Sequence, residues 1–396
     1  MIQTPAAGRG AVWLGGVLVL LFSLTPLVAW LGPLGFAPLA AVCGLAAIWN
    51  LRIGEADRPA AIAILVMVCW AVVSVVWSPY QPAKLGASTA AKLVAEAVLY
   101  WAMFRAAASA APASRALALK VLAWGLAAYG VLLVVEAASG ALIYRSLRQA
   151  IGDPIRPDLA IKNVAQGSFV LAVLAPAGAL AGWRAGAGVW PGLLIGAGVV
   201  AATLGLAADA PTLALVAGFL AGAAAYAWPK AAPRLLAACA AVYFLAMPWV
   251  LAAGWKSGLL QQVETRVELS WSMRLGYWRH AVDWTRDHPF RGWGLDASRM
   301  FGPGITLHPH NGALQVWLEL GLIGAMAAAV FFAVAMARQA RARRDLGAAA
   351  AVAAASAYLV MGAVSFGVWQ EWWLAVGALA ATACLALQRP GVAERP

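Results

Sequence analysis

The histidines of this chain are few and close together. Only four occur in 396 residues, and all lie in one segment: His280, His288, His308 and His310. An imidazole takes up or releases a proton near neutral pH, so histidine commonly transfers protons in enzyme reactions. The last two open the segment "HPHNGALQVWLELGLIGA", residues 308–325, which passes from polar residues directly into an apolar helical pattern. Candidate acid–base groups therefore precede an apolar span.

Cations gather around these histidines and in one earlier segment. Segment 254–311 holds Lys256, Arg266, Arg274, Arg279, Arg286, Arg291 and Arg299, and segment 139–162 holds Arg145, Arg148, Arg156 and Lys162. Such side chains bind anions through charge-assisted hydrogen bonds. Cations concentrated at a membrane surface indicate an anionic ligand there, although long loops of membrane proteins also tolerate positive charge.

The composition identifies the elements that must position these groups. The chain is 63% hydrophobic and 11% charged, with a mean hydropathy of +0.80, whereas soluble domains average about 25% charged residues. Apolar runs of about 20 residues, long enough to cross a bilayer core of roughly 30 Å, recur throughout. An outer-membrane barrel would instead show short alternating segments. The sequence predicts an all-α, polytopic membrane protein.

Twelve membrane-spanning helices are expected. Their ranges are 11–31, 34–50, 59–77, 86–106, 116–138, 163–183, 189–208, 211–228, 234–253, 312–337, 347–366 and 371–388. This predicts three regions: 1–253 with nine spans and the short basic loop 139–162, the large loop 254–311, and 312–396 with the last three spans.

The connections between these spans alternate between two sides of the membrane, and positive residues mark one of the sides. One side carries Arg9, Arg52, Arg58, Arg105, Arg115, Lys120, Arg184, Lys230, Arg234, the run from Arg338 to Arg344, Arg389 and Arg395. The positive-inside rule makes that side cytoplasmic, with both termini there. The two basic loops then face the opposite side. Because topology accounts for most of the +12 net charge, a nucleic-acid partner is not expected.

The large loop contains a helical stripe. Trp271, Leu275, Trp278 and Val282 are spaced as on one face of a helix. This favours a helix in the membrane interface, with aromatic rings at headgroup level, while a helix packed as a lid is the alternative. The helix is expected to break at His288–Pro289, where glycines supply tight turns.

Two motifs in this region resemble the O-antigen ligase/polymerase family of membrane glycosyltransferases. "RLGYWRHAVDWTRDHPFRGWG", residues 274–294, contains the family's Arg-x-x-x-Trp and Pro-x-x-Gly-x-Gly patterns. It is followed by a His-Asn that opens a span with Glu-x-Gly-x-x-Gly, within 308–325. "WSPYQPAKL" and "RPDLAIKNVAQGSFVLAVLAP", earlier in the chain, resemble family segments more weakly.

The resemblance implies a reaction and a location. A glycan would move from an undecaprenyl-diphosphate carrier to an acceptor sugar hydroxyl, at the periplasmic face of the bacterial inner membrane. Guanidinium groups would oppose the charge that develops on the leaving diphosphate, and a neutral imidazole would accept the hydroxyl proton. No cofactor is implied. No Asp-x-Asp or Glu-x-x-His pattern indicates a metal site, so a metal-independent transferase is expected.

The resemblance also implies roles for single residues. His310 corresponds to the catalytic histidine, as general base or acceptor orienter, and Arg274 to the arginine that contacts the diphosphate. Arg266 is a possible second contact, and Arg156 and Lys162 are further candidates. Helix capping for His310, headgroup pairing for Arg274 and solvated loop charges for the others are the structural alternatives.

Further residues have supporting roles in this interpretation. His308 would support the site, and Asn311 would act as the N-cap of the span that follows. Glu319 is an intramembrane carboxylate, a residue type that is rare and usually functional, although it could pair internally, for example with Lys92. Trp278 is expected to anchor the loop helix.

One position departs from the family pattern. Many members carry a Ser-Arg pair at the outer end of a mid-chain span, where this chain has "AADAPTLAL" with Asp209. Another cation, such as Lys162, would then have to replace that arginine.

The sequence leaves the acceptor open. A ligase transfers the glycan to lipid A–core, whereas a polymerase transfers it to another carrier-linked glycan. A transporter of lipid-linked sugars is the alternative from another class, and it would carry polar residues and broken helices near the bilayer midplane. The gathering of polar residues in two loops on one face favours chemistry at that face, with a ligase as the first expectation.

Overall fold

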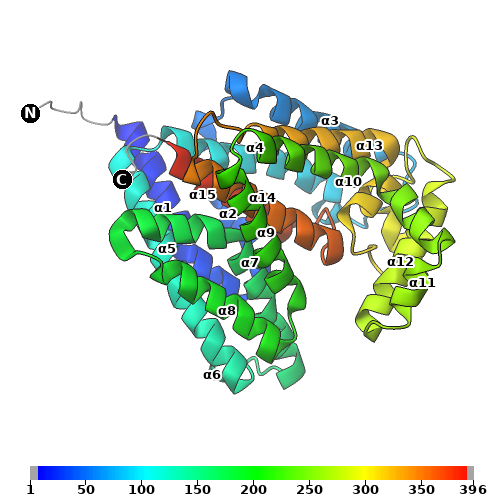
Figure 1. Cartoon of the computed structure of the whole chain (residues 1–396), viewed down its shortest axis with the longest axis horizontal. Coiled ribbons are helices and arrows are strands. Elements are labelled where there is room, and N and C mark those ends of the chain that lie inside the picture. Colours follow the sequence, from blue (N-terminus) through cyan, green and yellow to red (C-terminus); the bar gives the residue numbers. More distant parts are fainter. Residues whose placement is uncertain (1–7, 390–396) are drawn as a thin grey trace, which may run out of the picture.

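The computed structural model describes residues 8–389. Twelve helices there correspond one by one to the predicted spans: α1 (Arg9–Leu31), α2 (Phe36–Ala46), α3 (Arg58–Ser74), α4 (Thr89–Ser109), α5 (Pro112–Ser139), α7 (Pro157–Gly182), α8 (Trp190–Leu206), α9 (Asp209–Ala227), α10 (Ala231–Lys256), α13 (Gly312–Ala337), α14 (Leu346–Val364) and α15 (Glu371–Gln388). The connections add α6 (Leu142–Ala150), α11 (Leu259–Glu264) and α12 (Leu269–Thr285). Figure 1 shows this all-helical arrangement.

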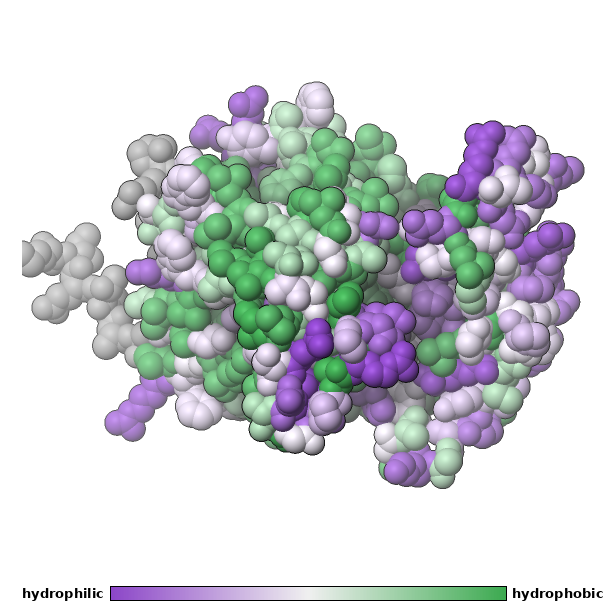
Figure 2. Space-filling view, turned by 90° about the horizontal axis from the view of Figure 1, so that it is seen from below, coloured by the Kyte–Doolittle hydropathy of each residue, from purple (hydrophilic) through white to green (hydrophobic). Residues whose placement is uncertain are grey.

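The length and apolar character of these helices confirm a polytopic membrane protein. Nine helical segments within residues 8–389 are long and apolar enough to cross a membrane. Two apolar helices are shorter, Pro33–Ala46 and Trp190–Leu206. The remaining helix, α4, is continuous, but its apolar sequence is interrupted by the charged residues Lys92, Glu96 and Arg105. Figure 2 shows a broad apolar surface over the middle of the molecule and polar residues at the end that carries α11 and α12.

Small residues let the helices approach one another closely. A Cβ on Gly130 of α5 would lie 2.2 Å from the Leu194 carbonyl oxygen of α8, and one on Gly198 would lie 2.6 Å from the Gly130 Cα. Close backbone contact of this kind is a main source of helix association in membranes, where burial of apolar surface gives little driving force. The sequence thus packs α5 against α8 through glycine.

The connections predicted to be cytoplasmic lie at one end of the bundle. Asp57, before α3, accepts from Arg105 of α4 at 2.7 Å and from Arg338 after α13 at 2.8 Å. Arg184 donates to the Leu387 carbonyl at 2.6 Å. These connections therefore share one end of the bundle, as the alternation of positive charge along the sequence predicted. The assignment of this end to the cytoplasm stays a prediction. The termini and the predicted cytoplasmic Arg395 lie outside the described residues.

At the other end, the segment after α12 packs against a break in α13. Gly321 has φ +62° and ψ −155°, which interrupts the helix and frees backbone groups. The Leu318 and Glu319 carbonyls accept from the backbone N–H groups of Trp293 and Gly294, each at 2.8 Å. The Leu320 carbonyl accepts from the indole of Trp70 at 2.9 Å. Every freed carbonyl named here has a donor, as buried backbone requires.

This contact explains the glycines of both motifs. A Cβ on Gly292 would lie 2.3 Å from the Glu319 carbonyl, and one on Gly321 would lie 2.5 Å from the Phe290 carbonyl. Gly292, Gly294 and Gly321 all have positive φ, as expected for tight turns. The Pro-x-x-Gly-x-Gly turn and the Glu-x-Gly break are thus two halves of one joint, which holds the large loop on α13.

Candidate functional site

Glu319 is the polar centre of this joint. The side chain is fully buried, and its carboxylate accepts four hydrogen bonds, from Ser298 Oγ (2.6 Å), Gln315 Nε2 (3.0 Å), the Asp296 N–H (2.8 Å) and Trp369 Nε1 (2.6 Å). The suggested partner Lys92 is wrong, because Lys92 pairs with Glu371 at 2.6 Å. With its lone pairs occupied, Glu319 positions the loop and does not face a ligand.

His310 lies where the loop enters α13. Its backbone is left-handed, with φ +55°, a rare conformation for a residue with a side chain. Its Nδ1 is 2.6 Å from the Ser365 carbonyl oxygen at the end of α14. A carbonyl only accepts, so Nδ1 carries the proton and Nε2 keeps a free lone pair in the neutral ring. The contact thus fixes the tautomer that can act as a base through Nε2.

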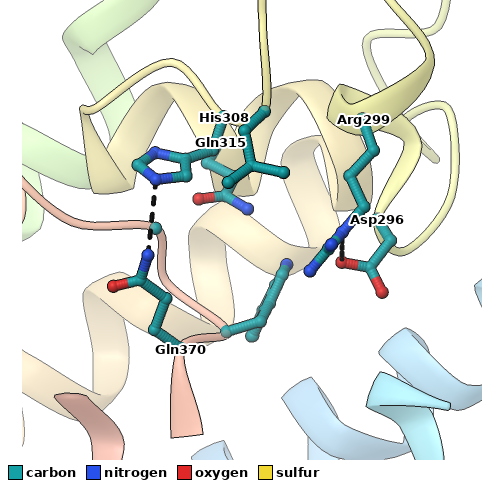
Figure 3. A pocket seen from close by; sticks show the side chains of 8 residues that line it. Asp296, Arg299, His308, Gln315 and Gln370 are labelled. Carbon is teal, nitrogen blue, oxygen red and sulfur yellow. Dashed lines mark hydrogen bonds and ion pairs between the residues drawn. The ribbon is translucent and has the colours of Figure 1, made fainter. Parts of the chain in front are cut away.

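His308 contacts the backbone and the ring of His310. Its Nδ1 accepts the backbone N–H of His310 at 3.2 Å, and the two ring centroids are 4.2 Å apart. Its Nε2 lies 3.5 Å from the Gln370 side-chain amide, as Figure 3 shows. Burial lowers the pKa of His308 to about 3, with further lowering by His310 and Arg299. His308 is therefore neutral at physiological pH and helps to hold the His310 backbone.

The electrostatic setting of His310 also keeps its ring neutral. Burial lowers its pKa below the usual 6.5, the contact with Ser365 opposes that effect, and the positive charge of Arg274 lowers the pKa further. A lowered histidine pKa means that the neutral form, the proton acceptor, prevails at neutral pH.

Arg274 comes to this site from α12. Burial lowers its pKa, and its guanidinium lies over the Trp271 ring, 4.7 Å from the centroid. No carboxylate within 4 Å pairs with Arg274 among the residues that the structure describes. A half-buried guanidinium beside a histidine, without a carboxylate, is suited to an anionic ligand.

The aromatic stripe of α12 fixes this helix to the protein. Val282 is buried in a cluster with Leu314 and Leu318 of α13. Leu275 is also buried, and Trp278 Nε1 donates to the Pro309 carbonyl at 2.8 Å. The predicted helix is confirmed, and Val282 and Trp278 of its stripe pack against α13 and the segment before it. Trp278 therefore anchors the chain at Pro309, one residue before His310.

The other predicted cations are not brought into contact with His310. Arg266 is exposed in the segment between α11 and α12. Arg156 pairs with Asp158 at 2.8 Å at the start of α7, and Lys162 is exposed on the same helix. Asp209, at the first turn of α9, is likewise exposed. Contact of Arg266, Arg156 and Lys162 with a ligand stays a prediction.

Asn311 is the N-cap of α13, as predicted. Its Oδ1 accepts the Leu314 N–H at 3.0 Å and the Tyr243 hydroxyl at 3.3 Å, and that hydroxyl accepts the Ala313 N–H at 3.1 Å. Tyr243 of α10 was not singled out in the sequence, because a tyrosine within an apolar span carries no signal of its own.

Ser365 and Gln370 were also missed, whereas Arg299 was predicted only as one of the cations of the large loop. Ser365 acts through its carbonyl, which no sequence pattern marks. Gln370 and Arg299 line a cavity of about 30 Å³ together with His308, Asp296 and Trp369, and Arg299 donates to Asp296 at 2.8 Å (Figure 3). Only the spacing of the polar turn before α15 could have indicated Gln370.

Comparisons with known proteins agree with this picture. Residues 191–329 match the family described as O-antigen ligase, a region that includes Arg274, His310 and Glu319. A Rickettsia conorii protein named "Putative polysaccharide ligase" is 27% identical over 118 residues, 26% of this chain and 29% of that protein. A Rickettsia bellii protein of the same name is 38% identical over 74 residues, 18% of this chain and 17% of that protein.

The chain therefore spans less than a third of the length of either relative. The matched region nevertheless contains both motifs that carry the resemblance. That resemblance is confirmed: residues 191–329 of this multi-pass membrane protein match the O-antigen ligase family.

Proposed function

We propose that this protein is a ligase-type glycosyltransferase. It moves a glycan from an undecaprenyl-diphosphate carrier to a sugar hydroxyl of lipid A–core, at the periplasmic face of the bacterial inner membrane, with both termini in the cytoplasm. The observation that carries the proposal is the pairing of His310, with Nδ1 held by Ser365 at 2.6 Å, and Arg274, a half-buried cation whose charge reaches the same imidazole.

The arrangement supplies both groups that the transfer needs. Nε2 of His310 accepts the proton of the acceptor hydroxyl, whose oxygen attacks the anomeric carbon of the donor sugar. The bond between that carbon and the diphosphate oxygen breaks, and the diphosphate leaves with the electron pair. Arg274 opposes the negative charge that grows on this leaving group, an effect that is strong in a partly buried site. The reaction requires no change in oxidation state.

The position of these groups suits a lipid-linked donor. His310 lies two residues before α13, so a diphosphate on a carrier embedded in the bilayer would reach it without leaving the membrane surface. Arg266, Arg156 and Lys162 supply further cations at the same end of the bundle and would contact the remaining charge of the diphosphate or its glycan.

The test is a transfer assay with purified protein. Wild type, His310→Ala and His280→Ala would each receive a polyprenyl-diphosphate glycan and two acceptors, lipid A–core and a second carrier-linked glycan. His280 is the control, because it lies in the same loop and stacks on Trp284 outside the site.

We expect wild type and His280→Ala to glycosylate lipid A–core, and His310→Ala to lose at least about 100-fold in rate, the usual lower bound for removal of a general base. Full activity of His310→Ala would remove this histidine from the mechanism. Transfer by wild type to the carrier-linked glycan alone would make the protein a polymerase. No transfer to either acceptor would contradict the proposed function.

A further inference from the structure

A second, larger cavity lies beside the histidine pair. Its volume is about 490 Å³, within the range of roughly 300–1,000 Å³ typical of sites for small organic ligands. Its walls include Tyr80, Lys92, Glu96, Arg299, Gln370 and Glu371. These residues come from the connection before α4, from α4, and from the loop and turn before α13 and α15, so separate parts of the chain build the cavity.

Two hydrogen-bond acceptors in this wall have no partner in the described part of the chain. Glu96 is 8% exposed, and its buried Oε2 accepts no hydrogen bond, and neither does the buried Oε1 of Gln370. An unpaired buried polar atom is costly, especially on a carboxyl group. A small rotation of either side chain would turn its acceptor into the cavity, where a ligand that donates hydrogen bonds would remove this cost.

The cations of the cavity are already neutralised. Lys92 pairs with Glu371 at 2.6 Å, and Arg299 pairs with the buried Asp296 at 2.8 Å. Bringing a phosphate into the cavity would place it beside Glu96 and Glu371 without an unpaired guanidinium or ammonium group to receive it. The cavity therefore differs from the Arg274 side of the site, which offers a cation without a carboxylate partner.

These features indicate which class of ligand the cavity would bind. An acyl or prenyl chain would leave both acceptors unpaired, and an anion would meet carboxylates. A neutral sugar supplies several hydroxyl donors, and the aromatic rings of Tyr80, Trp369 and Trp372 in the wall give apolar surface for its ring faces. The chemistry of the wall thus matches a hydroxyl-rich, uncharged ligand.

We propose that this cavity is the subsite for a neutral sugar residue of the acceptor glycan. Gln370 lines both this cavity and the small one at His308, and His308 touches His310, so an acceptor in this cavity would lie next to the histidine pair. The assignment to the acceptor rests on the proposed function, whereas sugar binding by the cavity stands on its own contacts.

Two variants test the subsite. Glu96→Gln keeps the shape of the side chain, and we expect it to weaken acceptor binding about tenfold, as for loss of a hydrogen bond to a charged group. Ala87→Trp, in the wall of the cavity, would fill part of it. The controls are Glu55→Gln, at the other end of the molecule, and Gly86→Trp, whose added Cβ meets no atom within 4 Å.

The first readout is the dissociation constant of core oligosaccharide, freed from lipid A by mild acid, measured by calorimetry on the intact protein in detergent. The second is the KM for lipid A–core and for the donor. We expect both test variants to raise the dissociation constant and the acceptor KM about tenfold or more, with the donor KM and thermal stability unchanged, and both controls to resemble wild type.

The outcomes separate the two proposals. The acceptor subsite is overturned if the variants bind the oligosaccharide as wild type does, or if only the donor KM increases. This holds even if wild type transfers glycan. A different outcome is that wild type transfers no glycan but binds the oligosaccharide, and that Glu96→Gln and Ala87→Trp weaken this binding. That outcome contradicts the proposed function and supports sugar binding by the cavity. Absence of oligosaccharide binding by wild type overturns the subsite.

Discussion

At the scale of residues, the site depends on how a single imidazole is held. The Ser365 carbonyl fixes the proton on Nδ1 of His310, and the backbone N–H of His310 is bound to the neighbouring His308. Few side chains adopt the left-handed backbone of His310 without support. The neighbours of His310 therefore determine both its protonation and the direction of its ring.

The pH dependence of transfer follows from the lowered pKa of His310. In the proposed mechanism the neutral ring is the base, so we expect activity to be retained as pH falls through 6.5, the usual histidine value, and to be lost only below it. A base with the usual pKa would already have lost about half of its neutral form at pH 6.5. The measurement is kcat/KM from pH 8 to 4.

A variant checks the origin of this shift. Arg274→Gln should move the acidic limb part of the way back toward pH 6.5, because it removes a positive charge that disfavours imidazolium. An acidic limb at pH 6.5 in wild type would contradict the lowered pKa.

Arg274 itself is expected to act mainly on the transition state. Replacing it by glutamine should lower kcat about 100-fold or more, the size of effect seen when one stabilising donor is removed. Arg279→Gln is the control on the same helix, where the side chain is exposed and should contribute little. Equal losses in the two variants would indicate a general electrostatic effect of the loop and contradict a specific role for Arg274.

At the scale of elements, the joint between the large loop and α13 positions the site. Two buried glycines, a broken helix and one carboxylate with four donors hold residues 289–298 against residues 318–322. Since α12 and the histidine segment lie on either side of this loop in the chain, the joint fixes the distance between Arg274 and His310.

Gly321→Ala tests the joint. The new Cβ would lie 2.5 Å from the Phe290 carbonyl, and the backbone conformation is one that costs other residues about 1–3 kcal/mol. We expect a lower melting temperature in detergent and lost transfer activity. Gly276→Ala, in α12 where no atom lies within 4 Å of the added Cβ, should be neutral or slightly stabilising. Similar stability of both variants would show that the close contact is not required.

At the scale of the whole molecule, the two ends of the bundle have different chemistry. One end holds the ion pairs of Asp57 with Arg105 and Arg338, whereas the other holds the histidine pair and both cavities. A lipid-linked donor and a lipid-linked acceptor would reach the second end from the same membrane surface.

Cysteine labelling tests the predicted orientation. The native cysteines would first be removed, and a single cysteine would then be introduced at Ser257 or at Arg343, both of which are exposed. The variants would be labelled in intact cells. We expect a membrane-impermeant maleimide added from outside to label Ser257→Cys once the outer membrane is permeabilised, and to label Arg343→Cys only after the inner membrane is also disrupted. The reverse pattern would place the site in the cytoplasm.

The sequence by itself determined the class of the protein, its helices and its main candidates. Apolar length decides where helices can span a bilayer, so a helix was found for each of the twelve ranges. The resemblance to a known family indicated His310 and Arg274, whose roles stay predictions, and the position of Asn311 before a span predicted the cap. The tertiary structure decided which groups meet. The Ser365 carbonyl, Gln370, the donors around Glu319 and the unpaired Glu96 come from distant parts of the chain. Such contacts depend on how the helices pack, and no local pattern of residues encodes them.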